Sequence, residues 1–174
     1  MYDYLNTVAK PRHLQIATSY LGVKEIPGKG SNPIILQWAK NIGVDKIYKD
    51  DDMAWCALFF ANTMKEAGRP IALETTDLYD YIRALKYQHI FTGIENPGIG
   101  DILIFQRKEG GHIGFYVGED ESCYHVLGGN QGNKVSIIRI EKSRCVAKRR
   151  PPYITFNPQP YYVSATGQIS KNEA

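Results

Sequence analysis

The spacing of the apolar residues changes near residue 97, and this change constrains the fold more than any other feature of the sequence. Before it, apolar side chains recur every three or four positions, as they do on one face of a helix. After it, they alternate with polar residues or form short runs, as they do in strands. Helices followed by consecutive strands predict an α+β fold, with the helices packed on one face of an antiparallel sheet.

Helical segments are expected in the first half of the chain. The clearest is the second, in which Asn32 is the cap, Pro33 stands in the first turn and Gly43 ends the helix. The third is apolar almost all round in its first half, which is typical of a buried central helix. The expected helices are residues 11–21, 33–42, 54–67 and 78–85.

Strands are expected in the second half. Because residues 118–120 supply turn chemistry, the second and third strands should form an antiparallel hairpin. A turn centred there would place Gly128 opposite His112. It would place His125 opposite Phe115, further along the hairpin. The expected strands are residues 102–106, 112–117, 122–127 and 135–140.

Length and composition predict one domain with a tail. The chain has 174 residues, enough for a single core, which we place at residues 1–150. Residues 151–174 are dominated by proline, tyrosine and polar residues, and we expect an extended or disordered C-terminal tail. The formal charge of +3 is too small to indicate a nucleic-acid partner. The longest apolar run, residues 54–61, is too short to insert across a membrane.

Three cysteines, Cys56, Cys123 and Cys145, form no CxxC pair, which argues against a disulfide framework and a zinc site. No metal or cofactor is therefore expected. Cys56 lies in the first turn of the third helix, where unpaired backbone amides and the helix dipole favour a thiolate. The aspartates before it oppose this effect, so activation needs an imidazole partner. The other two cysteines lie in or after strands and are expected to be structural.

Of the four histidines, His112 is the best partner for Cys56. It follows two glycines and opens a strand, a rigid edge from which a side chain can face a helix terminus. His13 and His89 lie on or just after helices and are expected to be packed or solvated. His125 would lie further along the hairpin on the opposite face, so we discount it as a catalytic partner.

The expected hairpin places Asn130 diagonally across from His112. In a cysteine hydrolase the second imidazole nitrogen needs an acceptor that fixes its tautomer and ring angle, and an asparagine carbonyl serves this purpose. Without this pairing, Asn130 would simply be a turn residue between two strands.

Four runs of residues resemble the motifs of one family. They are WCALF at 55–59, GDILIF at 100–105, GHIGFYVG at 111–118 and LGGNQ at 127–131. In this order they resemble the CHAP and NlpC-type peptidoglycan hydrolases of phages and bacteria, over roughly residues 11–140. The resemblance implies a papain-like fold with the nucleophile at the start of the central helix. It also implies metal-free hydrolysis of an amide, by an N-acetylmuramoyl-L-alanine amidase or a peptidoglycan endopeptidase.

By this resemblance Cys56 is the nucleophile, His112 the general base and then acid, and Asn130 the orienting group. Many CHAP members carry a glutamate two positions before the asparagine, where this chain has Gly128, and NlpC-type members often use a second histidine. Gln131 therefore stays open as the alternative to Asn130. No glutamine equivalent to that of papain-like enzymes precedes the cysteine, so we expect its backbone amide to bind the oxyanion.

Further residues beside these motifs are expected to contact the substrate. Asp51 and Asp52 could hold an ammonium group of the stem peptide, or simply form a solvated helix entry. Tyr116 could line the groove or pack in the core. Trp55 and Gln131, each next to an expected catalytic residue, are also expected to contact the substrate. The basic residues between 144 and 150 are expected to form a solvated patch.

The expected partner is the stem peptide of peptidoglycan. Residues 1–12 lack the apolar core of a secretory signal, so we expect synthesis in the cytoplasm and another route to the cell wall or periplasm. A phage lysin released through a holin, a virion-associated lysin and a secreted effector with an immunity protein all fit. Two other classes stay open: a catalytically silent wall-binding or virion domain, and a cysteine acyltransferase or deamidase acting on protein.

Overall fold

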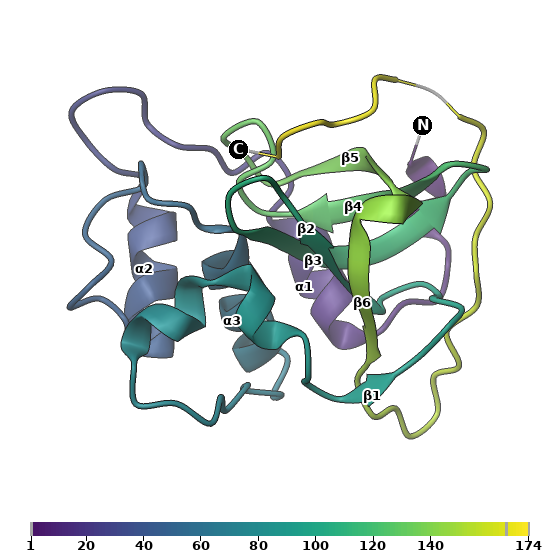
Figure 1. The fold of residues 1–174 in the computed structure, drawn as a ribbon, viewed down its shortest axis with the longest axis horizontal. Helices are drawn as coiled ribbons and strands as arrows, with labels where there is room; N and C mark the ends of the chain where they lie inside the picture. The colour runs from purple at the N-terminus through teal and green to yellow at the C-terminus, as the bar shows by residue number, and fades with distance from the viewer. Residues whose placement is uncertain (1, 166, 174) are drawn as a thin grey trace.

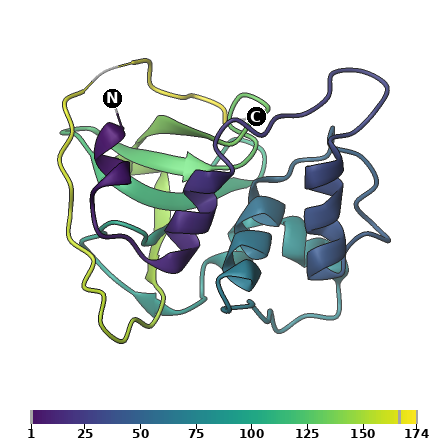
Figure 2. The same ribbon diagram turned by 180° about the vertical axis from the view of Figure 1, so that it is seen from behind.

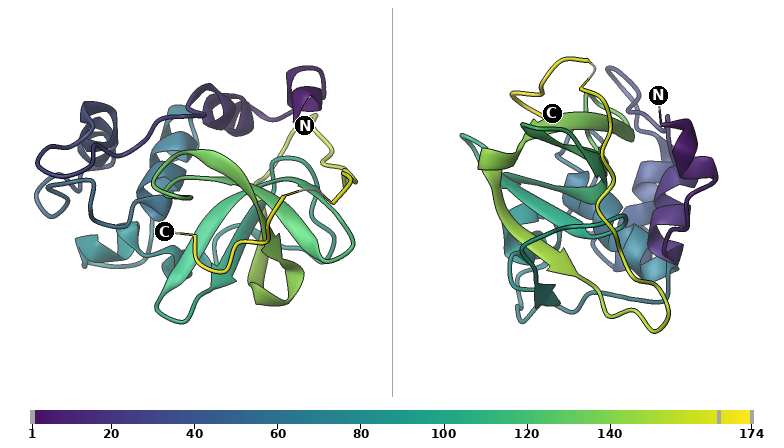
Figure 3. Two further views of the ribbon diagram at one scale, coloured as in Figure 1. Left: turned by 90° about the horizontal axis from the view of Figure 1, so that it is seen from above. Right: turned by 90° about the vertical axis from the view of Figure 1, so that its right-hand side faces the viewer.

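The computed structural model describes residues 2–165 and 167–173 and has an α+β fold (Figure 1). Three α-helices lie on one side of a six-stranded antiparallel sheet (Figure 3). The α-helices are α1 (Arg12–Ser19), α2 (Pro33–Ile42) and α3 (Cys56–Glu66), and the 3-10 helices are η1 (Asp3–Asn6), η2 (Leu78–Ile82), η3 (Ala84–Tyr87) and η4 (Lys142–Arg144). In sheet order β1-β6-β2-β3-β4-β5, the strands are β1 (Thr92–Gly93), β6 (Cys145–Arg150), β2 (Ile102–Gln106), β3 (Gly111–Glu119), β4 (Cys123–Gly128) and β5 (Ser136–Glu141).

The first three expected helices are present. In α2 the Asn32 side chain accepts from the Ile34 amide at 2.9 Å, and Gly43 ends the helix with a left-handed φ of +80°. The expected helix at 78–85 is wrong, because Arg83 adopts extended backbone and divides the segment into η2 and η3. Asp77 caps the start of η2, where its carboxylate accepts from the Tyr79 amide at 2.9 Å.

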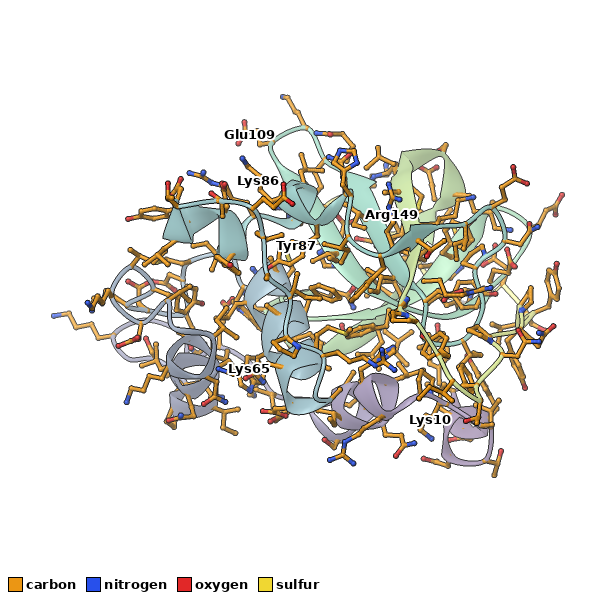
Figure 4. All side chains as sticks on the ribbon, turned by 90° about the horizontal axis from the view of Figure 1, so that it is seen from below. Lys10, Lys65, Lys86, Tyr87, Glu109 and Arg149 are labelled. Carbon is orange, nitrogen blue, oxygen red and sulfur yellow. The ribbon has the colours of Figure 1, made fainter. Side chains whose placement is uncertain are left out.

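The helix α3 is the centre of the packing. Every residue from Cys56 to Met64 is buried, and α3 contacts α1, α2 and the strands β3 and β4. Phe60 joins α3 to the sheet, with its ring centroid 5.5 Å from that of Phe115 on β3. It also lies 5.1 Å from the ring of Tyr87, which is labelled beside α3 in Figure 4. The start of α3 is therefore fixed against β3.

The hairpin of β3 and β4 forms, but its expected register is wrong. Phe115 pairs with Leu127, and after a bulge Gly118 pairs with His125. At the bulge, the carbonyl of Val117 accepts from the Tyr4 hydroxyl instead of pairing with β4. The main cause is the turn, which lies at residues 120–123, where the Asp120 amide donates to the Cys123 carbonyl, and not at residues 118–120. The bulge then changes the pairing by one further position.

The strand β6 was not expected. Its residues belong to the basic run that we interpreted as a solvated patch, yet Ile102 of β2 pairs with Arg149. Two cations of this run are in ion pairs: Arg144 with Glu173, and Arg150 with Asp101. The patch is therefore part of the folded sheet and its edges.

Residues 151–173, apart from the undescribed residue 166, are extended and follow the outside of the sheet (Figure 2). Isolated bridges pair Tyr162 with Glu119 and Ile169 with Arg139. The segment ends beside the β2–β3 turn and the loop between β4 and β5, where Figure 1 marks the end of the chain. It therefore connects one end of the sheet to the other. No helix in the described part of the chain is long and apolar enough to cross a membrane.

Candidate active site

Cys56 is the first residue of α3 and is only 5 % exposed. Backbone amides of Cys56, Ala57 and Ile113 are within hydrogen-bonding reach of its sulfur. Burial raises the pKa of the Cys56 thiol, while the Arg107 charge and the three amides act in the opposite direction without outweighing it. The amides expected at the helix start are in place, and the thiol is protonated in this closed structure.

The amide of Ile113 connects the cysteine to its expected partner, because His112 is the preceding residue on β3. His112 is 1 % exposed, and its Nε2 lies 2.9 Å from Oε1 of Gln131. Its Nδ1 is buried and has no hydrogen-bond partner among the described residues. The structure thus joins His112 of β3 to Gln131 of the loop after β4, and Cys56 of α3 lies near the amide that follows His112.

The hydrogen bonds of Gln131 fix the tautomer of His112. The amide nitrogen of Gln131 donates to the carbonyls of Val126 and Ser136, so its Oε1 is left to accept. The Nε2 of His112 must then be the donor, which leaves Nδ1 as the unprotonated nitrogen. An unprotonated, unpaired imidazole nitrogen is what a general base requires.

The imidazole is neutral in this environment. Burial lowers the pKa of His112 to about 4, and the charges of Arg107 and Arg144 add to this effect. The Glu173 carboxylate and the Gln131 hydrogen bond act in the opposite direction but are outweighed. A neutral imidazole is able to accept a proton from a thiol during nucleophilic attack.

Asn130, the expected orienting residue, has a different environment. Its backbone has a positive φ of +54°, and its buried Oδ1 has no hydrogen-bond partner among the described residues. In this structure the bond to His112 comes from Gln131, which the sequence left open as the alternative. A role for Asn130 in orienting His112 stays a prediction.

Two glycines allow this loop to lie close to the catalytic residues. A Cβ atom on Gly128 would lie 2.7 Å from Oε1 of Gln131 and 3.1 Å from Nε2 of His112. A Cβ on Gly129 would lie 2.6 Å from Cβ of Phe59 in α3. A glutamate at position 128, as in many CHAP members, therefore does not fit this arrangement, and Gly129 packs directly on the first turns of α3.

Of the residues expected to bind substrate in front of the cysteine, Asp51 and Trp55 are buried and Asp52 is exposed. Asp51 is fully buried, and its Oδ2 accepts from the amides of Ile26 and Asn32 at 3.1 and 2.7 Å. Asp52 is exposed. Trp55 is fully buried and donates its indole N–H to Glu25 at 2.6 Å. Glu25, which the sequence analysis did not single out, thus joins the acidic residues in front of the cysteine.

Tyr116, by contrast, is not part of the site. It is fully buried, and its hydroxyl lies 3.1 Å from a carboxylate oxygen of Glu119. The same hydroxyl accepts from the amide of Tyr161 at 3.0 Å, which fixes the extended residues 151–165 to the sheet. Its position on β3 therefore makes it a packing residue.

Three further charged residues act electrostatically on His112, and the sequence predicted a role in the site for none of them. They are Arg107, Arg144 and Glu173. Arg107, in the β2–β3 turn, affects both the thiol and the imidazole electrostatically. Arg144, on η4, holds Glu173 through two bonds of 2.8 Å. Only the folded sheet brings the turn, η4 and the tail to one place, so no local motif could have identified them.

The other two buried histidines and the other two cysteines have packing or hydrogen-bonding surroundings outside the candidate site. The Nε2 of His13 lies 2.7 Å from the carbonyl oxygen of Gly100, and burial lowers the pKa of this imidazole to about 4. His125 is bonded on both ring nitrogens. Cys123 is fully buried, and burial raises the pKa of Cys145 to about 11. The structural interpretation of both cysteines is consistent with these surroundings.

Comparisons with known proteins add no relative to this description. A scan against models of protein families gave no match, and a search of curated proteins found none with significant similarity. The function is therefore argued from the residues and their geometry.

Proposed function

We propose that this chain is a cysteine hydrolase with a papain-like arrangement that cleaves an amide in the peptide part of peptidoglycan. The observation that carries the proposal is the state of His112: Nε2 is bonded to Gln131, while Nδ1 is unprotonated, buried and unpaired. The Ile113 amide, next in the chain, reaches the sulfur of Cys56. The motif resemblance supplies the substrate class.

The first half of the proposed reaction forms an acyl-enzyme. Nδ1 of His112 takes the thiol proton as the sulfur of Cys56 bonds to the carbonyl carbon of the substrate. Backbone amides at the start of α3 stabilise the oxyanion that develops. His112 then donates the proton to the leaving nitrogen, the C–N bond breaks, and a thioester and a free amine result.

The second half restores the enzyme. Nδ1 of His112 accepts a proton from a water molecule, whose oxygen attacks the thioester carbonyl. The C–S bond breaks, the carboxylic acid leaves, and the proton returns to the sulfur of Cys56. Throughout both halves Gln131 holds the imidazole ring through Nε2, so the ring does not need to reorient between steps.

The charges around the site support a substrate that carries both signs. Glu25, Asp51 and Asp52 supply negative charge in front of the cysteine; burial, followed by the two aspartate charges, raises the pKa of Glu25. Arg107 and Arg144 supply positive charge. Stem peptides contain free amino and carboxylate groups, which suits such a site.

The test is the clearing of purified peptidoglycan sacculi by the wild-type chain and by Cys56→Ala, followed by mass spectrometry of the released fragments. Cys145→Ala is the matched control, because it removes a thiol outside the site. Clearing by wild type and Cys145→Ala alone would support the proposal, and the fragments would identify the bond. Equal clearing by Cys56→Ala, or none by any folded protein, would contradict it and favour a binding domain or a protein substrate.

A further inference from the structure

Cys56 and His112 are closed to solvent, at 5 % and 1 % exposure, so a substrate cannot reach them unless a covering element moves. Residues 167–173, which we call the covering segment, end at the loop that carries Gln131, where the Glu173 carbonyl accepts from the Gly132 amide. Every residue from 167 to 172 is exposed or half-buried. Glu173 alone is buried, and its side chain is fully enclosed.

The enclosed carboxylate of Glu173 is bound as a ligand would be. Both of its oxygens accept from Arg144, at 2.8 Å each, in the bidentate geometry that guanidinium groups form with carboxylates. Its backbone carbonyl accepts from the amide of Gly132 at 3.0 Å. Gly132 directly follows Gln131, so this bond lies one residue from the group that orients His112.

The same carboxylate is close enough to act on the catalytic groups. Glu173 and His112 influence each other electrostatically, and Arg107 influences Glu173, His112 and the Cys56 thiol. Arg107 also donates to the side chain of Asn172 at 3.2 Å. Asn172 and Glu173 of the covering segment therefore bind two arginines. Both arginines also act electrostatically on His112.

The rest of the covering segment is loosely packed. A cavity of about 940 Å³ is lined by Tyr2, by Ile137, Ile138 and Arg139 of β5, and by the covering segment itself. The segment is attached to β5 by the bridge of Ile169 with Arg139 and by the amide of Ser170. The carbonyls of Gly167 and Ser170 also accept from Arg139 and Arg144. A segment with this little burial can detach at low cost in free energy.

We propose that Arg144, with Arg107 beside it, binds a carboxylate of the substrate, and that Glu173 occupies this position as an internal substitute that keeps the site closed. The ligand class is a peptide with a free carboxylate near the scissile amide. The identity of this peptide rests on the proposed function, whereas the carboxylate position itself does not. The substrate would displace Glu173 from Arg144 and so open the site for itself.

The test compares the rates at which two reagents alkylate Cys56. Iodoacetate carries a carboxylate, whereas iodoacetamide is neutral, and both react with the same thiolate, so their ratio is independent of the thiol pKa. Peptide mass spectrometry separates modification of Cys56 from that of the other two cysteines. Rates are divided by those of free cysteine with each reagent.

In the full chain, Glu173→Gln should raise the Cys56 rate with both reagents by about tenfold, because a neutral amide replaces a charge-assisted pair. The rise should be several-fold larger with iodoacetate, because Arg144 is then free to bind it. Adding Arg144→Gln should keep the faster reaction with iodoacetamide and remove the preference for iodoacetate. Glu109→Gln is the matched control, an exposed carboxylate in the same turn as Arg107 (Figure 4), and should change neither rate.

Unchanged rates in folded Glu173→Gln would overturn the closing role of Glu173. A preference for iodoacetate that persists in the double variant would overturn the assignment of Arg144. Hydrolysis of sacculi is measured separately with Glu173→Gln, which should clear them faster than wild type. If alkylation behaves as expected and no variant clears sacculi, the carboxylate position stands and the peptidoglycan substrate fails.

Discussion

His112 and His125 are buried histidines on the neighbouring strands β3 and β4, but their hydrogen bonds differ. His125 is bonded on both nitrogens, to the Tyr2 hydroxyl at 2.7 Å and to Asp120 at 2.9 Å. His112 is bonded on one nitrogen only, and the other is enclosed without a partner. Because a buried unpaired polar atom is costly, the open nitrogen of His112 is consistent with the proposed reaction, whereas the complete bonding of His125 favours a role in stability.

The carboxylate of Asp120 reinforces this difference. Besides His125, it accepts from Arg139 at 2.7 Å and from the amides of Ser122 and Cys123. Although burial raises it, Arg139 and His125 hold the pKa of Asp120 well below its usual value. The group at His125 thus connects the N-terminal residues, the hairpin turn and β5.

The largest effect should come from removing the reactive pair. Cys56→Ala or His112→Ala is expected to lower the hydrolysis rate by at least about a thousandfold, since nucleophile and base act as a unit. Thermal unfolding of each variant provides the control for folding. Activity of His112→Ala within tenfold of wild type would remove the distinction between the two histidines.

The second effect concerns pH. Since the folded state keeps His112 neutral down to about pH 4, acid favours the unfolded state, in which the imidazole binds a proton with its ordinary pKa of 6.5. Stability is unaffected by this group above pH 6.5 and declines as the pH falls toward 4, by roughly 3 kcal/mol. Urea unfolding at pH 7 and pH 4.5 should therefore show a smaller loss for His112→Gln than for wild type. Equal losses would mean that His112 is protonated in the folded chain.

A smaller effect is expected at the other histidine. His125→Leu leaves the Tyr2 hydroxyl without its partner and removes one bond from Asp120, which should cost about 2 kcal/mol of unfolding free energy. Hydrolysis per folded molecule should stay at the wild-type level. Loss of activity without loss of stability would instead assign His125 to the catalytic machinery.

The smallest effect separates Gln131 from Asn130. Gln131→Ala should lower the rate about tenfold, because His112 loses the acceptor that holds its ring. Asn130→Gly, which keeps the positive φ without strain, should change the rate by less than about threefold. The reverse order of these two effects would restore Asn130 as the orienting residue.

The sequence predicts those parts of the fold whose signals are local. Asn32, Pro33 and Gly43 define α2 because caps and stops act within one turn. The strand β6 escapes prediction, because its run of basic residues lacks alternation and pairs with β2 across more than forty residues of chain. Similarly, the bulge after Tyr116 depends on a hydroxyl from the N-terminal Tyr4, which no pattern in the hairpin contains.

The same distinction holds for the site. The places of Cys56 at a helix start and of His112 at a strand start could be predicted, because both starts are local features. Their catalytic roles stay a prediction. The choice between Gln131 and Asn130 depends on the backbone of Asn130, whose φ of +54° results from the packing of the loop. The ion pair of Glu173 with Arg144 could not be predicted from any local pattern, because the two residues meet only when the C-terminal residues are folded against the sheet.

The close approach of Gly129 to Phe59 has a consequence for engineering this chain. The separation between the helix that carries the thiol and the loop that carries Gln131 is set by the Gly129 backbone against Cβ of Phe59 and the indole ring of Trp55. Any larger residue at position 129 would push these two elements apart by about the width of a methyl group, the scale on which misplacement impairs catalysis. A library that aims at new substrates should therefore leave this position unchanged and vary residues that face the incoming peptide.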